Sequence, residues 1–144
     1  QITAGFSATG WNDGNRRLVF HLTPYHRLEG TPRITLSLPM LYETYDRPFT
    51  FGLFSPTSYV EITPAVDIHF RRARIWNFDL GGRLGGQKEA ALEWKPIGAF
   101  HATIARDLRK GWGLQATVSH SSSNVASSTG FSRTSFFFTF AKTF

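Results

Sequence analysis

The feature that most constrains the fold is a strict alternation of apolar and polar residues, repeated along the whole chain. The clearest example is the C-terminal stretch SFFFTFAKTF, in which one face of an extended strand is almost entirely aromatic and the other is mostly small or hydroxylated. A period of two residues is typical of a β-strand, and no segment has the apolar spacing of an amphipathic helix over three turns. The sequence therefore predicts an all-β fold.

Eight alternating segments follow one another along the chain, each with a face of large apolar side chains and a face of charged, hydroxyl or small side chains. In chain order they cover residues 2–9, 18–25, 33–43, 60–70, 76–84, 99–105, 112–119 and 135–144. Consecutive strands joined by short connections form an antiparallel up-and-down arrangement. A chain of 144 residues is enough for one domain, so we treat 1–144 as a single up-and-down β-barrel domain of about eight strands.

The lengths of the strands and of their connections favour a membrane barrel. Strands of about ten residues match a tilted membrane-spanning strand and exceed the soluble average of about five to six. The connections alternate between a longer set (11–15, 46–58, 85–93, 120–130) and a tight set (28–32, 71–74, 107–111). Long outer loops and short periplasmic turns are typical of bacterial outer-membrane barrels, whose apolar face meets lipid. A soluble lipocalin-like barrel, with the apolar face buried, is the structural alternative.

Composition excludes several other classes of protein. No run approaches the roughly 18 apolar residues of a transmembrane helix. The chain has no cysteine, which excludes disulfides and thiolate metal sites. The net charge of +6 suggests a solvated basic rim rather than nucleic-acid binding, because no basic helix or aromatic RNA-binding motif is present. We expect no cofactor, since the GRLGG stretch lacks the helix that a phosphate-binding loop requires.

The last strand is expected to pair with the first, because backbone groups left unpaired in lipid have no water to bond. The ending also resembles the C-terminal signature of bacterial outer-membrane proteins, a final phenylalanine after alternating apolar residues. That resemblance implies that Phe144 is read by the outer-membrane assembly machinery, and Lys142 departs from the pattern. Eight strands close on an interior that their own side chains fill. We expect the isolated chain to close in this way; the alternative is a part of a wider barrel.

The polar face is predicted to point inward and to form a network of paired charges. Its principal members are Glu61, Asp67, Asp79, Arg83, His101 and Arg133. Such groups pair because an unpaired buried charge is costly. Strand pairing about the RRAR turn brings Glu61 opposite Arg83. We expect no metal site, because His69 and His101 are predicted to lie at different depths of the barrel.

One segment resembles a known family. The stretch 46–72 is similar to the GYFSPxxY segment in the C-terminal barrels of tetratricopeptide-linked outer-membrane proteins, which include the cellulose synthase operon protein C family and related exopolysaccharide export porins. The matching residues are Gly52, Phe54, Ser55, Pro56 and Tyr59. The resemblance implies that a β-1,4-glucan or similar polysaccharide passes through the barrel. Aromatic residues of this loop, Phe51, Phe54 and Tyr59, either stack on sugar rings or fold the loop onto the rim.

Two alternative functions remain open at this point. His120 and Ser122 resemble the His-x-Ser pair of outer-membrane lipid A deacylases, which are also eight-stranded barrels. A serine nucleophile needs a base that a third group orients, and 132–134 of the last strand offer no carboxylate for this role. A non-catalytic scaffold barrel is the third possibility. In each case we expect outer-membrane lipid and lipopolysaccharide as partners.

Aromatic and basic residues collect near the predicted strand ends. We interpret the aromatic ones as an interfacial girdle; they are Trp11, Tyr42, Trp76, Trp94 and Trp112. The RRAR turn, with Arg109 and Lys110 on another turn of the same side, either binds phospholipid headgroups or is simply solvated.

Overall fold

The computed structural model describes residues 1–12, 14–47, 56–73, 75–108, 111–123 and 131–142. These residues form ten β-strands and no α-helix. The strands are β1 (Ile2–Gly10), β2 (Arg16–Leu28), β3 (Arg33–Ser37), β4 (Met40–Tyr45), β5 (Tyr59–Ile62), β6 (Ala65–Arg72), β7 (Trp76–Glu89), β8 (Lys95–Asp107), β9 (Trp112–Ser123) and β10 (Phe131–Lys142). All of their pairings are antiparallel, which confirms the predicted all-β antiparallel fold.

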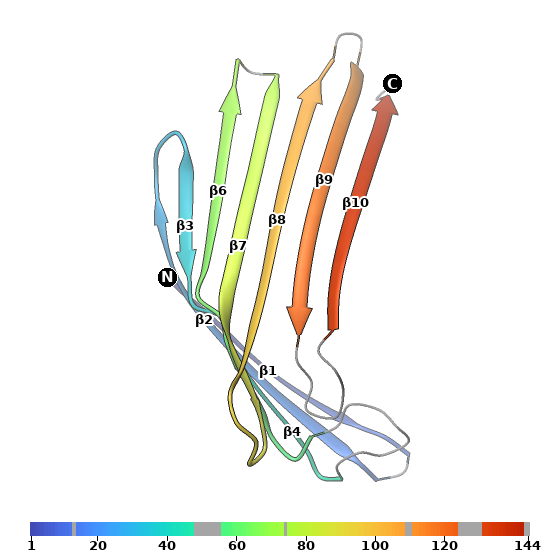
Figure 1. Ribbon diagram of the computed structural model, residues 1–144. Helices are drawn as coiled ribbons and strands as arrows, with labels where there is room; N and C mark the ends of the chain where they lie inside the picture. Colours follow the sequence, from blue (N-terminus) through green and yellow to red (C-terminus); the bar gives the residue numbers. More distant parts are fainter. Residues whose placement is uncertain (13, 48–55, 74, 109–110, 124–130, 143–144) are drawn as a thin grey trace.

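The ten strands correspond to the eight alternating segments of the sequence. Both β3 and β4 pair with β2, and both β5 and β6 pair with β7, so each couple is one long strand interrupted once. Along the sheet, the strands then follow one another in chain order, from β1 through the two interrupted strands to β10 (Figure 1). The up-and-down connectivity predicted from the short turns is therefore present.

The register sorts apolar and polar side chains onto opposite faces of the sheet. Residues directly opposite each other on neighbouring strands share a face. One row on the apolar face runs Ile34, Ile68, Leu80, Ala102, Val118 and Phe136. The adjacent row on the polar face runs Thr35, Asp67, Gly81, His101, Ser119 and Ser135. Each face is thus continuous across six neighbouring strands.

The sheet is open in the part of the chain that the structure describes. There β1 pairs only with β2, and β10 pairs only with β9, so the pairing of last and first strand that we expected is not formed. Figure 1 shows β10 standing at one side of the sheet and β1 lying across its lower part. Both strands therefore present a free edge of backbone donors and acceptors. A fully closed eight-strand ring is not the form that these residues adopt.

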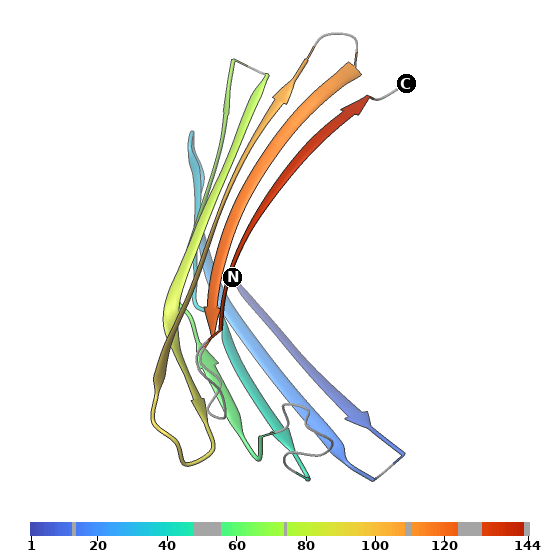
Figure 2. The ribbon, with the colours of Figure 1, turned by 45° about the vertical axis from the view of Figure 1, so that its right-hand side comes forward.

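A line of prolines bends the sheet at one level. Pro24 lies on β2, Pro39 between β3 and β4, and Pro64 between β5 and β6. Each carbonyl oxygen accepts a hydrogen bond from the neighbouring segment, at 3.0, 3.0 and 3.1 Å. Proline has no N–H to donate in return, so the ladder is incomplete at this level. The interruptions between β3 and β4 and between β5 and β6 fall here. In Figure 2 the strands above and below this level run in different directions.

The bend inserts no extra residue into the interrupted strands. On β7, Ile62 faces Gly86 and Ala65 faces Arg83, so the register is the same on both sides of the break. Apolar residues consequently stay on one face throughout. Gly85 allows the backbone of β7 to lie close to the break after β5, because a Cβ at this position would overlap the backbone carbonyl of Ile62.

Very little of the chain is buried. The buried apolar side chains among the described residues are Pro56, Tyr59 and Ile97, and the accessible surface is 10058 Å². A compact monomer of this mass exposes about 7,500 Å² by the usual scaling of surface with size. Among the described residues the sheet therefore has almost no core of its own, and its apolar face is exposed.

The structure also corrects the predicted loop boundaries. We expected a loop over 85–93, but β7 continues to Glu89 and pairs there with β5 and β8. Two of the predicted loop aromatics, Phe51 and Phe54, lie outside the described residues, as does Phe144.

Candidate functional site on the polar face

All six residues predicted for the inward-facing network lie on the polar face. The register pairs Glu61 with Gln87, Asp67 with Gly81, Asp79 with His69, Arg83 with Ala65, His101 with Ser119 and Arg133 with Ser121. The structure brings five of them into two clusters. Arg133, on the edge strand β10, forms no ion pair with any other described residue.

The first cluster is centred on Asp79. Its Oδ1 lies 2.9 Å from Nε2 of His101, and its Oδ2 lies 3.4 Å from Nδ1 of His69. Asp67 adds a second carboxylate, with Oδ1 4.0 Å from Nε2 of His101. The prediction that the two histidines lie at unrelated depths is wrong, because both reach the same carboxylate from the strands on either side of β7.

Gly81 provides the space in which Asp67 and His101 meet. It lies between them in the register, opposite Asp67 on β6 and opposite His101 on β8. A Cβ at this position would collide with both side chains. The absence of a side chain therefore lets the imidazole ring and the carboxylate approach each other over the backbone of β7.

The convergence of these groups does not create a metal site. Among the residues that the structure describes, no group of three or more histidine, aspartate or glutamate side chains has an arrangement that could hold a metal ion. Asp79 instead accepts hydrogen bonds from imidazole N–H groups. The cluster is therefore best described as a hydrogen-bonded chain across β6, β7 and β8.

The second cluster joins Glu61, Tyr59 and Arg83 nearer the loop end of the sheet. The Tyr59 hydroxyl donates to Oε2 of Glu61 at 3.0 Å, and Oε1 of Glu61 lies 3.9 Å from Nη1 of Arg83. The predicted Glu61–Arg83 contact is thus present on one face. Its predicted register is wrong by four residues, since Glu61 faces Gln87. The cause is the turn, whose last pair is Arg72 with Trp76.

Tyr59 is a structural member of this cluster rather than a loop aromatic. Its side chain is only 8% exposed, and its hydroxyl also lies 3.4 Å from Oε1 of Gln87. Gln87 in turn accepts a hydrogen bond from Ser123 at 3.1 Å. The buried position leaves the Tyr59 ring unable to stack on a sugar. The sequence contained a signal for this, because Tyr59 has the same parity as Glu61.

Sequence reasoning missed one strong ion pair on the polar face. Arg17 donates to both carboxylate oxygens of Glu43, at 2.8 and 3.0 Å, and its guanidinium lies 5.9 Å from the ring centroid of Tyr45. The ring of Trp11 stacks on that of Tyr45, with 6.0 Å between the ring centroids. The residues share odd-numbered parity, but only the register of β2 on β4 shows that they meet.

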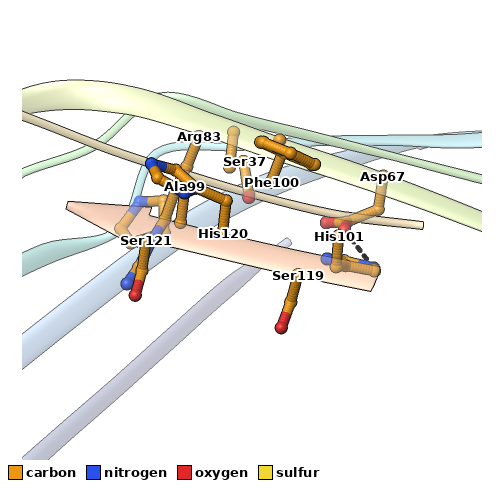
Figure 3. A pocket seen from close by; sticks show the side chains of 12 residues that line it. Ser37, Asp67, Arg83, Ala99, Phe100, His101, Ser119, His120 and Ser121 are labelled. Carbon is orange, nitrogen blue, oxygen red and sulfur yellow. Dashed lines mark ion pairs between the residues drawn. The ribbon is translucent and has the colours of Figure 1, made fainter. Parts of the chain in front are cut away.

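Between the two clusters the polar face is hollowed. A hollow of about 440 Å³ is lined by the polar side chains of Ser37, Asp67, Arg83, His101, Ser119 and Ser121, together with Pro39, Ala65, Ala99, Phe100 and His120. Figure 3 shows Asp67 and His101 pointing toward each other at its edge. The wall supplies hydrogen-bond donors and acceptors at several positions. It is suited to binding a polyol or water.

The candidate catalytic pair does not have the geometry of a nucleophile and its base. Nδ1 of His120 is hydrogen-bonded to Oγ1 of Thr134 at 2.8 Å, and the imidazole ring stacks on Phe100. The Ser122 hydroxyl instead bonds the backbone of Gly98, 3.2 Å from its N and 3.3 Å from its O. Within the described residues, no hydrogen bond joins His120 to Ser122 and no carboxylate orients the imidazole. These contacts serve the pairing of β8, β9 and β10.

Comparison of the chain with family models, with curated proteins and with solved structures gives no match. No helical segment among the described residues has the length and hydropathy needed to cross a membrane. The fold class is therefore established by the structure, and the resemblance to export porins stays a prediction from the sequence.

Proposed function

We propose that this chain is part of the wall of a bacterial outer-membrane β-barrel that exports an exopolysaccharide. The observation that carries the proposal is the exposure of one continuous apolar face opposite a continuous polar one. On β10 alone, Phe136 is 77% and Phe138 72% exposed. Exposed apolar surface costs about 25 cal/mol per Å² in water, and lipid removes that cost. A membrane barrel with its polar face inward uses both faces.

The lengths of the strands support a membrane-spanning role. The five uninterrupted long strands, β2, β7, β8, β9 and β10, have 13, 14, 13, 12 and 12 residues. A tilted strand needs about 9–11 residues to cross the hydrocarbon region. Each of these strands is therefore long enough to cross and to extend into the adjoining interface.

The open edges favour a wider barrel over a closed eight-strand one. Unpaired backbone groups of β1 and β10 cannot face lipid, because hydrocarbon offers no hydrogen-bond partners. Further strands must therefore pair with both edges in the membrane. A wider barrel has room for a hydrated passage, whereas eight strands enclose only their own side chains. The hollow on the polar face would then line that passage.

The kind of cargo rests on the polar face and on the segment around Pro56 and Tyr59 that resembles export porins. Serine and threonine hydroxyls alternate with charged groups along the polar rows, which suits transient hydrogen bonding to sugar hydroxyls. The absence of a tight cage is compatible with movement, since export requires binding that is easily reversed. A β-1,4-glucan or a similar neutral polysaccharide fits this chemistry.

Adjacent residues on β9 provide a direct test, because the natural chain has no cysteine. Ser119→Cys places a thiol on the polar face and Val118→Cys, its matched control, places one on the apolar face. In intact outer membranes we expect a charged, water-soluble maleimide to label Ser119→Cys within minutes and Val118→Cys hardly at all. Added cello-oligosaccharide should slow the first reaction and leave the second unchanged.

Other outcomes of this experiment identify the competing structures. Slow labelling of both variants indicates a closed barrel filled by its side chains. Rapid labelling of Val118→Cys with a chain that stays in solution without detergent indicates a soluble fold, and contradicts the proposal. Labelling of Ser119→Cys that no oligosaccharide affects supports a barrel with another role, such as a scaffold.

A further inference from the structure

The turn end of the apolar face carries cationic and tryptophan side chains in two neighbouring rows. Arg72 on β6 faces Trp76 on β7, which faces Arg106 on β8. One step further along the sheet, Trp112 on β9 faces Lys142 on β10. Three cations and two indole rings thus line one end of the face that otherwise holds only apolar side chains at this height.

The cations are held against the indole rings. The guanidinium of Arg106 lies 4.9 Å from the ring centroid of Trp76, and Nζ of Lys142 lies 5.4 Å from that of Trp112. Contacts of this kind hold a cation over the face of an aromatic ring. They also explain why Lys142 departs from the aromatic pattern of its strand.

The carboxylate next to Arg106 in the sequence, that of Asp107, forms its ion pair on the other face of the sheet. Asp107 pairs with Arg71 at 3.2 Å, and both residues belong to the polar face. On the apolar face, neither Arg72 nor Arg106 has an ion pair with a described residue. Their charge is therefore not compensated within the part of the chain that the structure describes.

A hollow and an apolar row lie directly beside these cations. The hollow, of about 370 Å³, is lined by Arg72, Ala73, Trp76, Phe78 and Ile104. The next row inward runs Phe70, Phe78, Ile104, Ala116 and Phe138. Trp76 and Phe78 stack, with ring centroids 6.2 Å apart, and form a flat wall from the cations to this row.

We infer that this hollow is a binding site for an anionic glycerophospholipid. Arg72 and Arg106 bind the headgroup phosphate, and an acyl chain lies along Trp76, Phe78 and Ile104. Charge complementarity selects the anion, and the adjoining apolar wall selects a lipid over free phosphate. The inference rests on the proposed membrane location, in which the short turns face the periplasm, where the outer membrane presents phospholipid.

The test compares lipids and variants on the full chain folded in neutral detergent micelles. Native mass spectrometry counts bound phosphatidylglycerol against phosphatidylcholine with the same acyl chains. We expect at least about a tenfold preference for phosphatidylglycerol, which is lost in Arg72→Gln/Arg106→Gln, because a charge-assisted hydrogen bond contributes on this order. The matched control is Arg27→Gln at the same end of the sheet, on the polar face, which should retain the preference.

Each other result decides between the site and the membrane proposal. A chain that folds but binds both phospholipids equally, or keeps its preference in the double variant, overturns the site alone. A stronger affinity for lipopolysaccharide than for phosphatidylglycerol also overturns it. A chain that does not fold into micelles or bilayers overturns the proposed membrane location and the site with it.

Discussion

His101 places its Nε2 atom 2.9 Å from Oδ1 of Asp79, although Thr103 and not His101 is the direct cross-strand partner of Asp79. The contact is diagonal, across β7 and β8, and long side chains can bridge such a diagonal on one face of a sheet. It links the row that contains Gly81 to the row that contains His69. The polar face is therefore coupled along the strands as well as across them.

Removing the Asp79 carboxylate should destabilise the sheet more than removing that of Asp67. The two side chains are similarly exposed, at 50% and 52%, but Asp79 has contacts at 2.9 and 3.4 Å and Asp67 only one at 4.0 Å. We expect Asp79→Ala to cost about 1 kcal/mol and Asp67→Ala close to zero, the range for exposed pairs. Urea titration of the chain in detergent measures both. In a His101→Ala background the difference should shrink, and an unchanged difference would contradict the assignment.

Gly81→Ala should be far more harmful than Gly82→Ala, although the residues are neighbours. A Cβ at Gly81 collides with His101 and Asp67, whereas at Gly82 its nearest neighbour is the Ala99 carbonyl at 3.9 Å. Overpacking of this kind costs about 1–3 kcal/mol. The midpoint of urea unfolding should fall for Gly81→Ala and stay near the natural value for Gly82→Ala. Equal midpoints would show that the His101 ring does not lie over β7.

In the second cluster, Tyr59→Phe should cost more than Arg83→Gln. The Tyr59 hydroxyl is buried and donates to Glu61 at 3.0 Å. Its loss leaves a carboxylate oxygen without that donor, which should lower the free energy of unfolding by about 1–2 kcal/mol. The guanidinium of Arg83 is 3.9 Å from Glu61 and half exposed, so the pair contributes under about 1 kcal/mol. From the sequence alone we expected the Glu61–Arg83 pair to point inward, where an unpaired charge is costly; the exposure of Arg83 lowers that expectation. The ranking is checked by thermal unfolding of both variants, and the reverse order would contradict it.

If the polar face lines a wet passage, its carboxylates should bias ion selectivity. Asp67 lines the hollow, and Asp79 on the adjacent strand is bonded to His101, which also lines it. The double substitution Asp67→Asn/Asp79→Asn removes both negative charges from this region. The reversal potential in a salt gradient should shift toward anions. The control is Asp46→Asn, at the loop end, where Asp46 is exposed and paired with Arg16. Identical potentials for all three proteins would place Asp67 and Asp79 away from the conducting path.

The period of two was enough to predict the faces of the sheet but not its curvature. The parity of Ile62 and Val66 is continuous across Pro64, so the sequence reads as one strand. The structure explains this continuity of parity, since the register of the interrupted strand on β7 is the same on both sides of the break. A bend that inserts no residue leaves no trace in the alternation. The prolines were visible, but their alignment at one level depends on two separate registers, that of β2 with β3 and β4 and that of β3 and β4 with β6 and β5.

The candidate site depended even more on distances that no local pattern contains. Parity placed His69, Asp79 and His101 on one face, yet their convergence depends on the register of β7 with both neighbours and on the missing side chain of Gly81. The Glu61–Arg83 contact was predicted correctly although the predicted register was wrong by four residues. Both side chains are long enough to meet in either register. The open edges differ from the closed eight-strand form expected for the isolated chain and agree with the alternative, a part of a wider barrel.

The line through Pro24, Pro39 and Pro64 gives this wall a crease. Each of the three prolines lacks an N–H donor, so at this level fewer hydrogen bonds resist bending of the sheet. Two stiff plates joined by a crease can adopt different radii at their two ends. In the proposed export barrel, a wall of this kind gives the passage two ends of different width, a funnel rather than a tube.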